Sequence, residues 1–489
     1  MNTQNGLGRY IFIILLGLFL AGPFSARNSF AESREGWPEY DTYGLEYRII
    51  QVTLIPPLGT NGIQSSQYAS KYSFNILAGY NGGLNNGYEF GVLNVNRYYT
   101  DARIQVGVLN LTGGRHRGFS LAGIGNAASG PLHGLQVGGL FQLSRSHMQG
   151  LQFTGGLHAA GGTISGVQVA GIGQYARGDL QGLQFSGLGN VSQKSISGIQ
   201  VAGLGNWASQ SLRGIKAASI ANVGGDRSSG IMISGLMNYS GSSGEGIFVS
   251  GIINHSTRNS SGIFTSGMAN VSEVAEGVFV TGAFNVAHRS MSGIQVAGLL
   301  NVAGRGVGVQ VAPFNIAKEF SGLPAGLISV YGNGRKQLNV QADETGFISL
   351  GVRTGTYEVH NTVSIGYKPC ITDRDVFALS WSAGYEKPLS ELWGLERLDD
   401  YFFLQELSIS LVQDDGWFKR NSSQIYSYRR LFGKDLTQGV RVYGGTTFNM
   451  LVSRSENMAD HHRYHFIETS RGGRSYRFWV GLTAGVQLF

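Results

Sequence analysis

The residues of this chain that could bind a metal ion are gathered near the C-terminus. His461, His462 and His465 lie beside Asp460 and Glu468, and imidazoles with carboxylates are common ligands of zinc and related metals. Adjacent histidines on a strand point to opposite faces, however, and the cluster precedes the last expected strand in a polar stretch. The pattern therefore favours a solvated loop, and we predict no metal site and no cofactor.

Other short motifs are weaker still. Arg177-Gly178-Asp179 spells a tripeptide known from adhesion ligands, but these three are also ordinary turn residues. Pairs such as Gly123 and Gly125 resemble phosphate-binding loops, yet they recur regularly and no helix follows them. The chain has no GxSxG elbow, no HExxH motif and no convincing catalytic triad. We therefore predict no catalytic residues and a protein that is not an enzyme.

The elements that carry these residues are set by a repeat of sixteen residues. Numbered from a glycine at position 1, most copies have apolar residues at positions 2 and 4, glycine at position 6 and asparagine at position 9. Gln142, His158 and Gln174 replace the asparagine in three copies. The regular repeat glycines are Gly134, Gly150, Gly166, Gly182, Gly198, Gly214, Gly230, Gly246 and Gly262. A short fixed period of this kind predicts a serially built, β-rich protein.

Two architectures fit the alternation between positions 2 and 10. In an antiparallel outer-membrane β-barrel, nine alternating residues suit a tilted strand whose apolar face meets lipid and whose Gln, Ser and Asn face lines the interior. In a β-solenoid, each repeat is one coil, the glycine at position 6 is a corner, and the asparagines form a hydrogen-bonded ladder. The apolar face of a solenoid is then expected in its own core.

Chain reach separates the two architectures. A straight alternating stretch spans roughly 30 Å, and the remaining five or six residues reach at most about 20 Å, too short to return to the start of a coil. The later spacings, from Gly262 to Gly277, Gly293, Gly308 and Gly322, are irregular, which loops tolerate better than a stacked ladder does. We therefore predict the barrel, with the solenoid followed by a C-terminal antiparallel β-barrel as the alternative.

The N-terminus resembles a secretory signal. Arg9 precedes an apolar run from Tyr10 to Ala21, and Ser29 and Ala31 suit a signal peptidase. We expect cleavage after Ala31, with Ala26 as the alternative site, because the run is shorter than the roughly 20 residues that span a bilayer. The mature chain is then expected outside the cytoplasm.

Composition narrows the class further. Charged residues make up only 14% of 489 residues, the 75 glycines are periodic, and Cys370 is the only cysteine, so no disulfide forms within the chain. The formal charge of +7 is diffuse, which argues against nucleic acid as a partner.

After Gly322 the repeat fades and longer alternating strands follow, joined by uneven polar segments, as in outer-membrane barrels. The expected strands are Gly346 to Arg353, Thr362 to Tyr367, Val376 to Tyr385, Glu406 to Val412, Val440 to Asn449 and Tyr476 to Phe489. The chain ends on an aromatic residue, part of the signal that barrel-assembly machinery reads. We divide it into a signal peptide (1–31), an N-terminal segment with the first strand (32–71), a glycine-rich repeat region (72–330) and a barrel-like region (331–489).

Several segments together resemble an exported surface-repeat family of Gram-negative bacteria. They are Leu54 to Gly62 (LIPPLGTNG), Phe74 to Gly83 (FNILAGYNGG), the serial GLQxxGLxN units and Ala325 to Ile328 (AGLI) after Pro324. The resemblance implies an outer-membrane or cell-surface location, with no catalytic residues to carry over.

The expected function is that of a non-enzymatic outer-membrane or cell-surface repeat protein, as a structural or pore-forming barrel. The alternative is an adhesion-like interaction module that uses a repeat solenoid, and a distant third is an outer-membrane hydrolase using carboxylates or the histidine cluster. The expected partners are outer-membrane lipid, the barrel-assembly machinery and an unknown surface ligand.

Overall fold

The computed structural model describes residues 43–369, 376–414, 423–453, 465–471 and 474–489, and almost all regular structure in them is β. Residues from Glu46 onward form one compact unit. Across the described ranges, no helix has the length and hydropathy needed to cross a bilayer.

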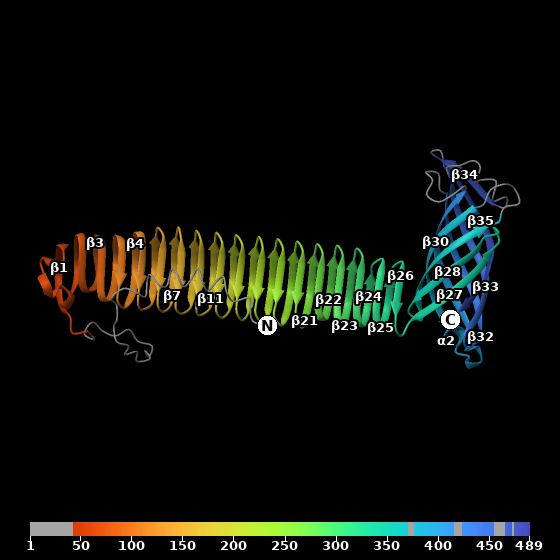
Figure 1. The fold of residues 1–489 in the computed structure, drawn as a ribbon, viewed down its shortest axis with the longest axis horizontal. Coiled ribbons are helices and arrows are strands. Elements are labelled where there is room, and N and C mark those ends of the chain that lie inside the picture. The colour runs from red at the N-terminus through yellow and green to blue at the C-terminus, as the bar shows by residue number, and fades with distance from the viewer. Residues whose placement is uncertain (1–42, 370–375, 415–422, 454–464, 472–473) are drawn as a thin grey trace. The chain divides into compact units, whose positions relative to one another are not determined.

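The repeats form a parallel β-solenoid (Figure 1). Its first elements are β1 (Glu46–Ile55), β2 (Leu58–Gly59), the 3-10 helix η1 (Gly62–Gln67), β3 (Tyr68–Thr112) and β4 (Arg115–Ala128). Regular coils then alternate a long and a short strand. The long strands are β5 (Leu132–Gly138), β7 (Met148–Thr154), β9 (Ile164–Ala170), β11 (Leu180–Ser186), β13 (Ile196–Ala202), β15 (Leu212–Ala218), β17 (Ser228–Ser234), β19 (Ser243–Ser250) and β21 (Asn259–Ser266).

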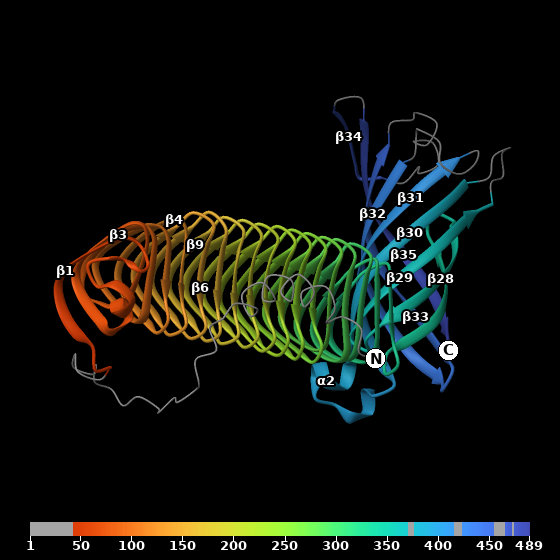
Figure 2. The same ribbon diagram turned by 60° about the vertical axis from the view of Figure 1, so that its left-hand side comes forward.

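The short strands are β6 (Phe141–Ser144), β8 (Leu157–Ala160), β10 (Gly173–Ala176), β12 (Gly189–Ser192), β14 (Gly205–Ala208), β16 (Ala221–Gly224), β18 (Met237–Ser240) and β20 (Ile253–Ser256). In the last coils the strands fuse or lengthen, as β22 (Ala269–Thr281), β23 (Phe284–Ala297), β24 (Leu300–Val311), β25 (Phe314–Ala325) and β26 (Ile328–Tyr331). Figure 2 shows the coils from a second direction.

The prediction that the repeats are antiparallel barrel wall is wrong. Each strand pairs in parallel with the equivalent strand one repeat later, as Gly182 does with Gly198 and Asn190 with Asn206. The alternating stretch is not straight, because it is interrupted between the long and the short strand at positions 6 and 7. The coil therefore closes within sixteen residues, and the reach argument, which assumed a straight strand, does not apply.

The repeat glycine makes the second bend of the coil. Fourteen glycines from Gly118 to Gly322 have φ between +95° and +137°, a region that residues with a Cβ rarely adopt. A Cβ on Gly198 would also lie against the carbonyl oxygen of Gly182 in the preceding coil, far inside normal contact distance. Backbone conformation and coil spacing together require glycine at position 1.

Amide ladders fill much of the solenoid interior, as the solenoid alternative predicted for position 9. Asn206 donates through Nδ2 to Oδ1 of Asn222 at 2.9 Å and to the carbonyl of Ala217 at 3.2 Å. The same asparagine-to-asparagine bond joins Asn94 to Asn126, is interrupted where Gln142, His158 and Gln174 stand, and then repeats from Asn190 to Asn315. Because these stacked asparagines bond one another, most of the polar interior at position 9 is hydrogen-bonded, whereas the amides of Gln136 and Gln152 at position 3 have no hydrogen-bond partner in the described residues.

The outer surface of the solenoid carries the apolar side chains. At positions 2 and 4, Ile199 and Val201 are 38% and 39% exposed, while Gln200 between them is fully buried. The expectation that the apolar face would lie in the solenoid's own core is therefore wrong. Ladder bonding satisfies the amides inside, which leaves the alternate, apolar positions on the outside.

Buried apolar volume shifts between two positions along the solenoid. In the first regular coils, position 15 is Leu132, Met148, Ile164, Leu180, Ile196 or Leu212, while position 3 is glutamine or Lys216. In β19 and β21 the residues at position 3 are Phe248 and Phe264, and the centroids of their rings are 4.7 Å apart. The residues at position 15 of these strands are small, Gly244 and Ser260. A Cβ on Gly244 would meet both rings at 3.3 Å, so the small residue makes room for the aromatic stack.

The irregular late spacings do not disrupt the ladder. Bulges lie between Ser272 and Val274 in β22 and between Ala287 and Ser290 in β23. These bulges fall in the polar part of the coil, after the asparagine, so the register of the ladder is restored before the next glycine. We expected a stacked ladder to tolerate such slips less well than loops do, but here the ladder is preserved because the slips fall outside it.

The C-terminal region is an antiparallel sheet closed on itself, which we call the closed sheet. Its elements are β27 (Arg335–Asp343), β28 (Ile348–Gly355), β29 (Val359–Lys368), β30 (Val376–Pro388), α2 (Leu389–Trp393), η2 (Glu396–Leu398), β31 (Tyr401–Asp414), β32 (Ser423–Thr437), β33 (Val440–Ser453), β34 (Ile467–Arg471) and β35 (Arg474–Leu488). Because β27 pairs with both β28 and β35, eight strands close into a ring, and β34 adds to β35 beside β27. The sequence prediction missed β27, β32 and β34.

Candidate functional site

The closed sheet presents large apolar side chains outward, and its interior is polar and charged except for two small apolar clusters, one around Phe347 and Trp479 and one around Phe402 and Leu404. This is largely the reverse of a water-soluble closed sheet. One row of paired residues on the outer wall runs through Trp381, Ile409, Tyr426, Met450 and Phe478. The exposed large apolar side chains of the wall include Leu338, Ile348, Leu350, Val352, Ile365, Leu379, Leu407, Ile409, Leu411, Phe432, Phe448, Val480 and Leu482. Apolar-out, polar-in alternation is the pattern of strands that face lipid.

Ion pairs occupy one end of the interior. Glu386 of β30 accepts two hydrogen bonds from Arg335 at 2.8 and 2.7 Å and one from Arg441 of β33 at 2.7 Å. All three side chains are at most 9% exposed. The contacts join β27, β30 and β33, which lie at different points around the ring, so they cross the interior instead of lining it.

A second set of ion pairs lies beside the first. Glu406 of β31 is bonded to Arg353 of β28, lies 3.1 Å from Nε2 of His360, and is 3.5 Å from Nη1 of Arg429. Glu406, Arg353 and His360 are essentially inaccessible to solvent. Four arginine and two glutamate side chains, with each glutamate shared between two arginines, therefore fill this part of the interior, which argues against the pore-forming version of the predicted barrel.

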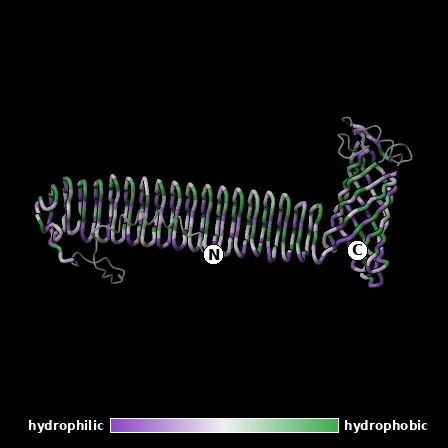
Figure 3. The backbone as a smooth tube through the Cα atoms, viewed as in Figure 1, coloured by the Kyte–Doolittle hydropathy of each residue, from purple (hydrophilic) through white to green (hydrophobic). Residues whose placement is uncertain are grey.

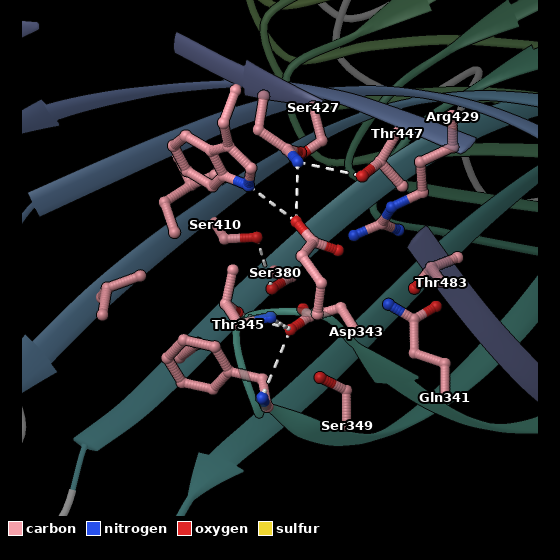
Figure 4. A pocket seen from close by; sticks show the side chains of 17 residues that line it. Gln341, Asp343, Thr345, Ser349, Ser380, Ser410, Ser427, Arg429, Thr447 and Thr483 are labelled. Carbon is pink, nitrogen blue, oxygen red and sulfur yellow. Dashed lines mark hydrogen bonds between the residues drawn. The ribbon is translucent and has the colours of Figure 1, made fainter. Parts of the chain in front are cut away.

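A small polar cavity lies farther along the interior (Figure 4). Glu344, in the turn after β27, accepts hydrogen bonds from Nε1 of Trp479 at 2.6 Å and from Nδ2 of Asn449 at 3.0 Å. Asp343 accepts from the backbone N–H of Thr345 at 3.0 Å. The cavity holds about 30 Å³, room for a water molecule or two, and is too small for an organic ligand.

The sequence-based metal cluster is only partly visible. Asp460, His461 and His462 lie outside the described residues. Nε2 of His465 is 3.2 Å from Glu468, which also accepts a hydrogen bond from Arg477 at 2.9 Å. In the described ranges, no three histidine, cysteine or acidic residues are grouped as metal ligands would be.

The remaining sequence candidates have structural positions in the solenoid. His158 replaces the ladder asparagine and is fully buried, and this burial lowers its pKa to about 3. Arg177, Gly178 and Asp179 form a turn between coils, where Oδ1 of Asp179 accepts the backbone N–H of Ser195 at 3.0 Å. Gly123 and Gly125 belong to β4 and its coil, so none of these motifs forms a shared site.

Two buried charges in the ladders were not singled out from the sequence. Glu89 is fully buried and accepts hydrogen bonds from Asn75, Asn81, Asn96 and Gln105 at 2.7 to 3.1 Å. Desolvation raises its pKa. Four amide donors divided between its two oxygens suit the ionised carboxylate, so the surrounding amides replace the water that burial removed.

Lys216 stands where the preceding coils have glutamine. Its ammonium is bonded to Oε1 of Gln200 and donates to the carbonyls of Gly198 at 2.8 Å and Arg213 at 2.6 Å. No carboxylate is among these contacts, and desolvation lowers its pKa to about 7. Both buried charges could have been found by looking for departures from the consensus at position 3.

Stability is expected to depend on pH through Lys216. Because its folded-state pKa is about 7, the unfolded chain binds more protons between that pH and the ordinary lysine pKa, and stability should rise with pH by up to about 1.4 kcal/mol per unit. Lys216→Gln should stabilise the protein at pH 7 and remove this slope, as urea unfolding at several pH values would measure. Lys194→Gln, at an exposed position, is the control, and an unchanged slope in Lys216→Gln would contradict the assignment.

Comparison of the chain with protein-family models, curated proteins and solved structures finds no match.

Proposed function

We propose that this protein is a non-enzymatic interaction module of the outer membrane, with the closed sheet as its membrane anchor and the solenoid as its interaction surface. The observation that carries the proposal is the closed sheet's apolar outer wall around a charged, filled interior. In water this arrangement would expose a large apolar surface and bury six charges, whereas in a bilayer the same wall meets acyl chains.

The solenoid supports the second part of the proposal. Repeat solenoids present extended, regular surfaces that partners bind, and among the described residues of the closed sheet the buried ion pairs occupy the space that solute passage would need. The signal-like N-terminus and the resemblance to exported surface-repeat proteins are consistent with assembly in the outer membrane. We therefore favour an anchored interaction module over a pore.

Insertion into lipid vesicles tests the anchor. The full chain, refolded with vesicles, is expected to protect the closed sheet from protease, while Ile409→Arg should reduce the inserted fraction because a charge on the lipid face costs about 2–4 kcal/mol near the bilayer centre. Ile409→Leu is the matched control. Full digestion of the wild-type closed sheet, or equal insertion by Ile409→Arg, would count against a membrane anchor.

A further inference from the structure

The solenoid is divided lengthwise into two halves of different polarity. We call positions 2, 4, 7, 8 and 10 the apolar half and positions 12 to 14 and 16 the polar half. In the coil that starts at Gly198, the apolar half holds Ile199, Leu204 and Trp207, which are 38%, 48% and 49% exposed. Figure 3 shows hydrophobic residues gathered along one edge of the coils and hydrophilic residues along the other.

The charged residues of the solenoid are also confined to one half. Between Gly118 and Tyr331, only Lys216 is charged and interior, and all the others stand in the polar half. They are Arg145, Arg177, Asp179, Lys194, Arg213, Asp226, Arg227, Glu245, Arg258, Glu273, Glu276, Arg289, Arg305, Lys318 and Glu319. Basic residues outnumber acidic ones in this set, so the polar half suits a surface that carries negative charge.

The apolar half is both large and featureless. At roughly 4.8 Å per coil, fourteen coils extend about 65 Å, so this strip exceeds the few hundred Å² of apolar surface that soluble monomers tolerate. Specific protein interfaces carry about one hydrogen bond per 100–200 Å², but here polar atoms come only from scattered residues such as Tyr175, Thr265 and His255. A fluid layer of acyl chains needs no matching hydrogen-bond partners. The apolar half therefore suits lipid better than a folded protein partner.

The closed sheet indicates which side of the membrane is involved. The chain enters β27 at Arg335 and leaves β35 at Leu488, and both residues lie at the end of the sheet where β28 and β29 are joined by 356–358 and β32 and β33 by 438–439. The connection 389–400, with α2 and η2, is at this same end. The strand ends that flank 369–375, 415–422 and 454–466 lie at the other end, as does the turn 344–347. In outer-membrane barrels the short turns are periplasmic and the longer loops extracellular.

The apolar half is continuous with the outer wall of the closed sheet. Nε1 of Trp381 donates a 2.8 Å hydrogen bond to the carbonyl of Gly326, at the corner of the last coil. The backbone N–H of Ser329 donates to Oγ1 of Thr354 at 2.9 Å, and because both residues are buried this bond joins the interior of the last coil to the closed sheet. Exposed Leu392, Trp393 and Leu395 follow β30 at the same end as the entry of the chain, where a membrane surface would receive them.

We infer that the solenoid lies on the periplasmic leaflet of the outer membrane, with its apolar half at the boundary between phospholipid headgroups and acyl chains. This inference rests on the proposed membrane anchor. It places the solenoid on the inner side of the outer membrane, whereas the sequence led us to expect the outer membrane or the cell surface. The arrangement is that of an interfacial amphipathic helix, enlarged to a rigid structure of many coils.

Two labelled positions in one coil test the contact with lipid. In a Cys370→Ser background, Leu204→Cys in the apolar half and Gln210→Cys in the polar half each receive an environment-sensitive dye. In full-length protein inserted into phosphatidylethanolamine–phosphatidylglycerol vesicles, we expect nitroxide-labelled acyl chains to quench the Leu204→Cys dye several-fold more than the Gln210→Cys dye. Equal, water-like signals would overturn the inference, and so would energy transfer between copies without lipid quenching, which would identify a second copy as the occupant.

Further labels distinguish the two proposals and identify the side of the outer membrane on which the solenoid lies. A dye on Leu411→Cys, on the outer wall, should be quenched by the labelled lipid. If this dye is quenched and the dye on Leu204→Cys is not, the membrane anchor is supported and the lipid-bound solenoid is rejected. If neither dye is quenched, the anchor itself is rejected. In cells, a membrane-impermeant maleimide should reach Gln210→Cys only after the outer membrane is permeabilised. Labelling in intact cells would place the solenoid on the cell surface.

Discussion

Gly198→Ala is expected to destabilise the solenoid by about 3 kcal/mol or more and to disrupt pairing with the neighbouring coils. An alanine at φ +98° loses roughly 1–2 kcal/mol to backbone strain alone. Its Cβ would also overlap the carbonyl of Gly182, so the coils must separate and lose ladder bonds. Unfolding of the full chain by urea, followed by circular dichroism, measures the effect.

Gly189→Ala is the matched control for this prediction. Gly189 stands at position 8, where other coils carry Ala221, Met237 or Ile253, and a Cβ there has its nearest contact at 3.2 Å. Its φ is not in the left-handed region, so the substitution is expected to change stability by less than about 0.5 kcal/mol. Equal effects of the two substitutions would show that the bend at position 1 does not require glycine.

Glu406→Gln is expected to destabilise the closed sheet by about 3–5 kcal/mol, because removal of one member of a buried ion-pair set leaves charge uncompensated. Glutamine keeps the shape of the side chain, so the loss reports the charge facing Arg353 and Arg429. The measurement is the urea midpoint of the closed sheet in detergent micelles, read from tryptophan emission.

The exposed pair of Lys387 and Glu391, 3.8 Å apart, provides the comparison for Glu406. Glu391→Gln should cost less than about 1 kcal/mol, since exposed ion pairs contribute little. If Glu406→Gln were as mild as this control, the interior charges would be solvated, and an open, water-filled interior would return as a reasonable description.

The sequence predicted the elements of the solenoid better than their arrangement. Repeat glycines such as Gly198 and ladder residues such as Asn206 were visible, and the asparagine ladder was predicted under the solenoid alternative. The choice between barrel and solenoid depended on whether the stretch from Ile199 to Trp207 is straight, and spacing alone cannot show that it bends. The outward direction of the apolar side chains was missed because hydropathy suggests that they are buried. In the structure, amides such as Gln200 occupy the interior instead.

In the closed sheet, too, the sequence predicted the facing of residues along a strand better than the contacts between strands. The alternation of Phe478, Val480 and Leu482 marked the outer face of the last strand, and those side chains are exposed. Charges such as Glu386 stand on the opposite phase of their strands and could have been noticed as interior. Their pairing with Arg335, 51 residues away, follows from how the sheet closes, and local sequence contains no information on that closure.

The exchange of volume between positions 3 and 15 constrains how the gene for such a protein can grow or shrink. Unequal recombination can add or remove one unit among those that carry Gln152, Gln168 and Gln184, because each unit and its neighbours have glutamine at position 3 and a large aliphatic residue at position 15. The units of Phe248, Phe264 and Phe279, whose rings stack in series, can exchange only with one another, since one of them inserted into the first group would place an aromatic ring against a large aliphatic residue at position 15. Length variation among descendants of this sequence should therefore occur within each group of units and not mix the two.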